Sequence, residues 1–296
     1  MALTLNTNII SLKVRGNLDK ATEGMNTAIQ RMTTGYRINN SMDDAAGYSI
    51  AVQMQADLGS YEVAANNAQI GSDMLTTLEG NYDLLNSHLQ RIRELTEQAS
   101  NDTYGQDSRE AIQKEIVARC EEISRIALSC NYNGMNLMDG SSATTAPNGY
   151  NIQVGIDGRA NSRINLKQDL FSDCTATAVF KAANNNTAIT ITTLAQSCAG
   201  LVTGKKAYDM LSVIDNAMST ISERVTILGA AQNKLESAAS SIDVATINQT
   251  SSLSTIRDAD VAEESTSYIQ QQIIQSAAST LLATANQSPS IALDLI

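Results

Sequence analysis

Apolar residues recur at steps of three and four along most of the chain, a spacing typical of helices that pack through one face. The longest such run spans residues 46–99, where only Asp57, Gly71 and Thr96 interrupt the apolar face. One uninterrupted helix is therefore predicted there. Runs of the same kind predict four further helices, over residues 1–34, 107–130, 207–257 and 258–288.

The expected helix ends rest on capping residues and breakers. Asp107, with Glu110 three residues later, has the form of a capping box, so we expect a helix to begin there. Arg257-Asp258 marks a break between the last two helices, and Pro289 is expected to end the final one. The chain has only two prolines, so little interrupts the long helices.

Within residues 150–166 the apolar spacing changes to two, which predicts strands. Asp157-Gly158 lies in the middle of this segment and is a hairpin turn signal. The alternating apolar residues are Ile152, Val154 and Ile164. We therefore expect a β-hairpin here.

Residues 175–205 are rich in Thr, Ala and Asn and predict a small surface tip, with Ile189 and Ile191 in a weak strand. The whole pattern predicts a mainly α protein. Long coiled-coil helices from both termini form an extended bundle, with a β-hairpin and a small β-containing tip.

Composition and charge narrow the function. Hydrophobic residues make up 43% of the chain and aromatic residues only 4%, which suits helix seams better than the core of a compact enzyme. The net charge of −11 disfavours nucleic acid and anionic lipid as partners. No run of 18 apolar residues is present, so no membrane span is expected, and the N-terminus does not have the form of a cleavable signal peptide.

Few residues suit catalysis or metal binding. The one histidine, His88, is expected on a solvent-facing helix surface, and no Cys pair has zinc-ligand spacing. Neither a P-loop nor a GxGxxG motif occurs, so we expect no enzyme activity and no cofactor. Cys120 and Cys130 fall on an apolar helix face and are interpreted as buried structural thiols.

The terminal helices are amphipathic but poor in large residues. Each alone would bury too little surface to offset the entropy lost on ordering. We therefore expect them to pair with each other or with neighbouring subunits, and to become ordered on assembly.

Seven segments, in order along the chain, resemble the bacterial flagellin family. The first four are QRMTTGYRINNSMDDAAGYSIA (30–51), LQRIRELTEQASNDTYGQDSREAIQKEI (89–116), YNG followed by Leu137 (132–137) and YNIQVGIDGRANSRINL (150–166). The C-terminal part contributes LGAAQNKLESA (228–238), IRDADVAEES (256–265) and LLATANQSP (281–289). The final ALDLI and the four cysteines depart from the family's usual pattern.

The resemblance implies a division into five segments. Residues 1–44 would be the N-terminal inner-tube helix and spoke, called D-zero, and residues 45–174 the outer-tube helices and hairpin, called D-one. Residues 175–205 would be a short variable tip, so the outer domain is nearly absent. Residues 206–257 and 258–296 would return through D-one and D-zero.

The resemblance also implies roles for particular residues. The paired termini would line the inner tube through the apolar residues Leu5, Ile9, Leu12, Met25, Met32, Ile269, Ile273 and Leu281. The spoke would include Arg37, Asp43 and Asp44. The hairpin, with Ile152, Val154, Asp157, Gly158 and Ile164, is the element we assign to switching between two subunit packings. Apart from the resemblance, Cys174 and Cys198 flank the tip by their position in the sequence, and after export they would either form a disulfide or stay free.

The partners implied by the family are mostly other parts of the flagellum. The chain would be an extracellular homopolymer for swimming motility, exported unfolded by the flagellar type III apparatus without signal cleavage. An export chaperone, the filament cap and the hook-junction proteins would contact it. Host Toll-like receptor 5 would recognise the D-one surface at Gln90, Arg91, Leu95 and Glu115, although an ordinary lattice salt bridge also explains Arg91 and Glu115.

Three other functions compete with the filament subunit. A hook–filament junction protein resembles flagellin at both ends but less through residues 89–138. A helical adhesin or effector would not polymerise. A flagellin with a catalytic outer domain would need more than the short tip and one histidine.

Overall fold

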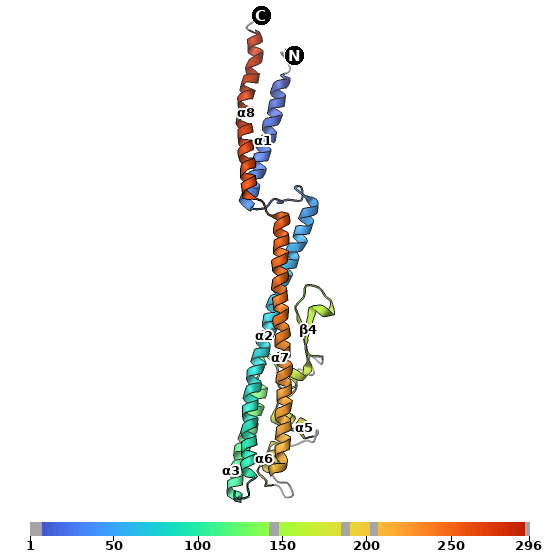
Figure 1. Ribbon diagram of the computed structural model, residues 1–296, viewed down its shortest axis with the longest axis vertical. Coiled ribbons are helices and arrows are strands. Elements are labelled where there is room, and N and C mark those ends of the chain that lie inside the picture. Colours follow the sequence, from blue (N-terminus) through green and yellow to red (C-terminus); the bar gives the residue numbers. More distant parts are fainter. Residues whose placement is uncertain (1–7, 142–147, 185–189, 202–206, 294–296) are drawn as a thin grey trace. The chain divides into compact units, whose positions relative to one another are not determined.

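The computed structural model describes residues 8–141, 148–184, 190–201 and 207–293, with side chains to residue 287 (Figure 1). The chain forms two compact units, each described by itself below. Unit 1 comprises Met1–Gly59 and Thr246–Ile296, and unit 2 comprises Ser60–Ala245. Two long helices, α2 (Ala45–Ala99) and α7 (Ala207–Arg257), contribute to both units. The expected segment borders at 44/45 and 257/258 coincide with ends of these helices, whereas the units divide within them.

Unit 1 is built around two terminal helices that lie side by side (Figure 1). These are α1 (Ile9–Thr34) and α8 (Val261–Leu293). Helix α1 ends at Gly35, whose φ of 74° is a left-handed conformation that glycine adopts without strain. Helix α8 continues through Pro289, so the expectation that this proline ends the helix was wrong.

Unit 2 has a core formed by α2, α7 and the helix α3 (Gln106–Ser129). The apolar face predicted for residues 46–99 is buried from Ala64 onward. The large side chains of α2 on this face are Leu75, Leu78, Tyr82, Leu85, Leu89 and Ile92, and Leu95 is buried beside them. At the earlier positions of the same run the face is only half-buried, and Ile50 is exposed.

Short elements cover this core. The strands β1 (Asn131–Tyr132) and β2 (Met135–Asn136) form one antiparallel pair, and β3 (Tyr150–Gln153) and β4 (Arg163–Leu166) form another. The 3₁₀ helices η1 (Ala160–Ser162) and η2 (Gln168–Phe171) follow β3 and β4 respectively. Two helices, α5 (Ala176–Ala183) and α6 (Ile191–Cys198), pack on α3. Phe171, Phe180 and Leu194 carry their apolar surface into the core.

The predicted fold class is confirmed, since the chain is mainly helical with small antiparallel strand pairs. Two local predictions were wrong. Helix α3 begins at Gln106 with Gly105 as its N-cap, so Asp107 lies in the first turn and does not cap it. Ile191, expected in a weak strand, begins α6, where Thr190 and Thr193 form a capping box. Ile189 lies outside the described residues.

No helix in the described ranges is apolar over a length that could cross a lipid bilayer.

Candidate functional site

The contact between α1 and α8 is made by small side chains. Its buried positions are Ala21, Ala28, Ala278 and Ala285. On each helix the two alanines are seven residues apart, which keeps them on one face. Because alanine extends so little from the backbone, the two helices can approach closely. Met25 and Met32 are half-buried on the same face of α1, as predicted.

Five larger residues assigned to this seam lie outside it, each more than half exposed. They are Ile9, Leu12, Ile269, Ile273 and Leu281. As contacts between α1 and α8 these assignments were wrong, because the prediction followed large apolar residues while the observed seam uses alanine and amides. Leu5 lies outside the described residues. Four residues that border Ile269 on α8 form a shallow groove with it: Thr266, Gln270, Ile273 and Ile274.

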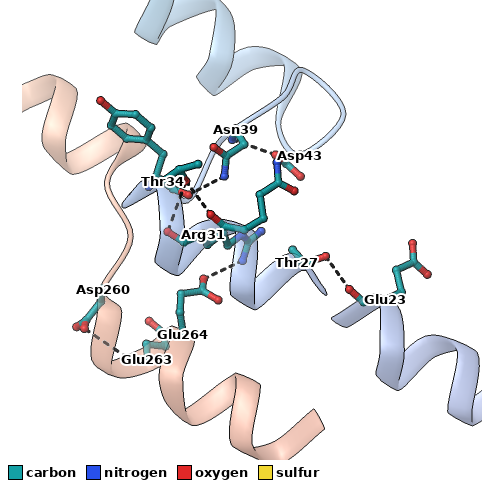
Figure 2. Close-up of polar contacts among 11 residues, drawn as sticks. Glu23, Thr27, Arg31, Thr34, Asn39, Asp43, Asp260, Glu263 and Glu264 are labelled. Carbon is teal, nitrogen blue, oxygen red and sulfur yellow. Dashed lines mark hydrogen bonds and ion pairs between the residues drawn. The ribbon is translucent and has the colours of Figure 1, made fainter. Parts of the chain in front are cut away.

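Polar side chains also cross the seam. Near its middle, Gln275 Nε2 donates to Thr22 Oγ1 at 3.2 Å. Where α1 ends and α8 begins, Arg31 Nη1 lies 3.0 Å from Glu264 Oε1 (Figure 2). The Glu264 side chain is only 12% exposed, so this ion pair is largely shielded from water. Polar pairs inside a helix seam favour one register at some cost in stability.

The connectors that leave α1 and α7 are tied together by their backbones. The Ala259 N–H donates to the Gly35 carbonyl at 2.9 Å, and the Arg37 N–H donates to the Arg257 carbonyl at 2.7 Å. Between these bonds Tyr36 and Asp258 form an antiparallel bridge. The Arg257 guanidinium also lies 4.2 Å from the centre of the Tyr36 ring, a cation–π contact. The connectors of unit 1 therefore form a fixed crossing.

The three predicted spoke residues each order a different piece of this connector. Arg37 Nη2 donates to the Ile256 carbonyl at 2.8 Å, near the carbonyl end of α7, where a cation is favoured. Asp43 Oδ2 accepts the backbone N–H groups of Asn40 and Asn39 at 2.9 and 3.0 Å, and these bonds hold the pKa of Asp43 below its usual value (Figure 2).

Asp44 starts the next helix. Its Oδ1 accepts the N–H groups of Ala46 and Gly47, both at 3.0 Å, which satisfies two donors in the first turn of α2. Asp260 does the same for α8, since its Oδ1 accepts the N–H of Ala262 at 2.8 Å. The sequence prediction named Asp44 but did not assign it this capping role.

The predicted switch hairpin is present, but its turn is longer than predicted. Ile152 faces Ile164 across β3 and β4, and both pack against the core of unit 2, as does Val154. Asp157 and Gly158 are exposed within the loop of residues 154–162 and do not form a two-residue turn.

The hairpin loop is held by side chains of its own residues, and its first strand also accepts a hydrogen bond from α2. Gln153 Nε2 donates to the Gly155 and Asp157 carbonyls at 2.7 and 2.8 Å. The Ser162 hydroxyl bonds to the Asp157 carboxylate. Asn67 Nδ2 of α2 donates to the Gln153 carbonyl at 3.2 Å, which ties the strand to the helix.

The predicted receptor residues are only partly brought together. Arg91 Nε lies 3.0 Å from Glu115 Oε1 of α3, and its Nη1 lies 2.9 Å from Glu94 Oε2, so the two carboxylates raise the pKa of the exposed Arg91 guanidinium. Gln90 is exposed beside Arg91. Leu95 is only 2% exposed, because it faces the core of unit 2. The assignment of Leu95 to a receptor-accessible surface was therefore wrong.

All four cysteines are buried and free, so of the two alternatives for Cys174 and Cys198 the structure has the free thiols and not the disulfide. The Arg224 guanidinium donates to Cys174 Sγ at 2.7 Å, while Cys198 ends α6. Burial raises the pKa of the Cys198 thiol to about 11 and that of Cys120 to about 12. The reading of Cys120 and Cys130 as buried thiols is confirmed.

His88 is half-buried, and its Nδ1 atom is buried without a hydrogen-bond partner in the described chain, so the solvent-facing placement was wrong. Burial and, after it, the charge of Arg119 lower the pKa of His88 below 6.5, while Glu122 acts in the opposite direction. The unfolded chain therefore binds more protons than the folded chain as the pH falls through about 6.5.

We expect the free energy of unfolding contributed by this site to be complete above neutral pH and to fall as the pH is lowered toward 5. Urea denaturation of the full chain and of His88→Gln at several pH values measures this. The difference between the two chains isolates His88 from the carboxylates, which titrate in both. An equal loss of stability in both chains on acidification would contradict the assignment.

Several contacts of the site were not predicted from the sequence. The pair Arg31 and Glu264 has no distinctive signal, because 233 residues separate the partners. Asn8 lies directly before the apolar start of α1 and has the N-cap pattern Asn-Ile-Ile-Ser, which could have revealed it.

Comparisons with known proteins give the same family as the sequence resemblance. Residues 5–143 match the bacterial flagellin N-terminal helical region, and residues 211–296 match the bacterial flagellin C-terminal helical region. The flagellin of Listeria innocua is 32% identical over 295 residues, 99% of each chain. The flagellin of Bacillus subtilis is 31% identical over 306 residues, 99% of this chain and 100% of its own. The flagellin of Xenorhabdus nematophila is 33% identical over 317 residues and the full length of both.

With both flagellin helical regions matched and relatives aligned from end to end, the chain belongs to the bacterial flagellin family, a family of structural proteins of the flagellar filament.

Proposed function

We propose that this chain polymerises into the filament through the outward apolar faces of α1 and α8. The observation that carries the proposal is the exposure of large aliphatic side chains on these faces. Ile9 and Leu12 on α1, and Ile269, Ile273 and Leu281 on α8, are 53–64% exposed. Apolar residues in such a row mark an interaction surface. Since α1 already packs on α8 through alanines, these faces are available to neighbouring copies.

Helical filaments arise when one surface of a subunit binds a different surface of the next copy, so that the contact does not close into a ring. The end-to-end match to flagellins favours the filament subunit over the hook–filament junction protein. Electron microscopy of the purified chain after seeding with filament fragments tests the proposal. Long tubes support it. A chain that stays monomeric at high concentration, with seeds and a precipitating salt, would favour a junction protein or a non-polymerising adhesin.

The same proposal includes the division into an inner tube, a spoke and an outer tube, with residues 1–44 and 258–296 in the inner tube. The connector ladder between residues 35–37 and 257–259 supports a spoke, because it fixes the backbone where the two segments cross. The hairpin of residues 150–166 remains the proposed switch between subunit packings. Besides the packing of its apolar side chains on the core, the hairpin is tied to α2 by the hydrogen bond from Asn67, a polar contact that two packings can make and break.

Export is proposed to proceed unfolded through the flagellar type III apparatus, without signal cleavage, to the cell exterior. An export chaperone, the filament cap and the hook-junction proteins are the proposed partners on this route. The contact between α1 and α8 supports this proposal physically. A seam made of alanines and polar pairs buries little apolar surface, so it opens at low free-energy cost.

Recognition by host Toll-like receptor 5 is proposed at Gln90, Arg91 and Glu115. Arg91 is the central residue, because its guanidinium bonds both Glu94 and Glu115 at an exposed surface. We expect Arg91→Ala to reduce receptor signalling by the monomer at least tenfold, which corresponds to about 1.4 kcal/mol or more of binding free energy.

A reporter-cell assay with purified monomer measures this effect. Arg125→Ala is the matched control, because Arg125 of α3 also forms an exposed ion pair, with Glu122. Equal signalling by the wild-type chain and Arg91→Ala would argue that the ion pair serves only the fold or the lattice.

A further inference from the structure

Pro289 creates a specific gap in the hydrogen bonding of α8. A helical carbonyl normally accepts the N–H of the residue four positions later. Pro289 has no N–H, so the carbonyl of Ala285 cannot receive that bond even though the helix continues to Leu293. Ala285 is 9% exposed, on the face that contacts α1. A buried carbonyl oxygen that accepts no hydrogen bond lowers the free energy of unfolding.

A residue from the other end of the chain supplies the missing donor. Asn8 Nδ2 donates to the Ala285 carbonyl at 2.7 Å across 277 residues of sequence. The oxygen of the same amide accepts the Ser11 N–H at 3.0 Å and so caps the start of α1. Beside it, Ser11 Oγ donates to Asn286 Oδ1 at 3.0 Å. One side chain thus completes the first turn of α1 and the interrupted turn of α8.

We propose that Asn8 and Pro289 form a register lock that selects one alignment of the two terminal helices for assembly. The alanines of the seam cannot do this alone, and the lock acts together with the polar pairs Gln275–Thr22 and Arg31–Glu264. Each helix has two of these alanines, seven residues apart, so a slip of seven residues still places one alanine of α1 opposite one alanine of α8. The gap made by Pro289 occurs at one carbonyl only. Sliding the helices by one heptad separates Asn8 from that carbonyl.

The lock rests on the proposed function, since register matters only if the terminal pair presents its outer faces to other copies. In the correct register the exposed side chains of α1, such as Leu12, hold fixed positions relative to those of α8, such as Ile273 and Leu281. A slipped pair would offer a mismatched surface. Subunits with a slipped pair would therefore add to a filament end more weakly.

The test is a double-mutant cycle on the full-length chain. Asn8→Asp keeps the oxygen that caps α1 but removes the Nδ2 donor. Pro289→Ala restores the backbone N–H to α8, so the Ala285 carbonyl no longer needs Asn8. Asn17→Asp, at an exposed position of α1, is the control for the added charge. The measured quantity is the critical concentration for seeded polymerisation.

We expect Asn8→Asp to raise the critical concentration about fivefold, the equivalent of one hydrogen bond, and to change it much less when Pro289→Ala is also present. Asn17→Asp should leave it within about twofold. An equal effect of Asn8→Asp in both backgrounds, or no effect in either, overturns the lock. If the wild-type chain itself never elongates seeds, the proposed function fails instead, so the two failures are distinguishable.

Discussion

Removal of residues 1–40 or of residues 258–296 is expected to abolish filament formation while leaving unit 2 folded. The first deletion takes away α1 and the second takes away α8, so in either case the remaining helix loses the face that buried its alanines. The outer apolar rows then have no rigid support. Because filament growth requires both terminal helices in this proposal, elongation should fall below detection even at concentrations at which the full chain polymerises completely.

The four buried cysteines give this experiment an internal control. All of them lie in unit 2, where they are shielded from solvent, and burial raises their pKa values. In a correctly folded truncated chain they should react with a thiol reagent as slowly as in the full chain, and rapidly only after denaturation. Fast reaction would indicate that the deletion has unfolded unit 2. Filaments formed by either truncated chain would contradict the role assigned to the terminal pair.

A less drastic variant separates the two faces of α8. Ile273 points outward with 64% of its surface exposed, whereas Ala278 is buried against α1. Changing the first to a polar residue removes outer apolar surface without touching the seam, and enlarging the second opens the seam without touching the outer face. Variants at these two positions therefore distinguish the loss of the outer apolar face from the loss of the contact with α1, which the truncations remove together.

The parts of the fold that were predictable are those in which large apolar side chains repeat. Residues such as Leu75 and Leu89 lie on one face of α2, and their burial follows from spacing alone. Spacing did not predict the contact between α1 and α8, because its buried residues are alanines, which also occur on exposed surfaces. Large residues such as Ile269 follow a regular spacing too, but on the face that this chain leaves open.

The hydrogen bonds of the connector could not be predicted from the sequence, for a different reason. Its ladder joins the backbones of Gly35, Arg37, Arg257 and Ala259, and backbone groups carry no side-chain signature. Arg91 was found only through resemblance, which placed it correctly beside Glu115. The resemblance also assigned Leu95 to the receptor surface, although Leu95, four positions after Arg91, turns toward the core. Family patterns transfer residue types, and burial must still be established for each position.

Gly149 is the position at which a single methyl group is expected to cost the most. Its φ is +80°, and a Cβ there would lie 1.8 Å from the Leu166 carbonyl oxygen. Neither atom can yield easily. Leu166 is fully buried and pairs with Tyr150 at the start of the β3–β4 ladder. The Tyr150 ring in turn packs edge-to-face on the buried Phe171, with centroids 4.9 Å apart.

We therefore expect Gly149→Ala to lower the free energy of unfolding of the full chain by about 3 kcal/mol, from backbone strain together with displacement of the hairpin from the core. Urea denaturation measures the loss. Gly158→Ala is the matched control, because this glycine lies in the loop of the same hairpin, has no atom within 4 Å of the added Cβ and does not have a positive φ. Its effect should stay within about 0.5 kcal/mol.

The pair of variants also tests the proposed switch. If the hairpin positions subunits in the filament, Gly149→Ala should alter filament shape under conditions in which the rest of unit 2 is still folded, as reported by the unreactive thiols. Gly158→Ala should leave filament shape unchanged. Normal stability and normal filaments in Gly149→Ala would mean that the chain accommodates the methyl group by moving β4, and that the β3–β4 register is not what fixes the hairpin. A large loss of stability with normal filaments would support the packing of the hairpin on the core and would contradict its role as the switch.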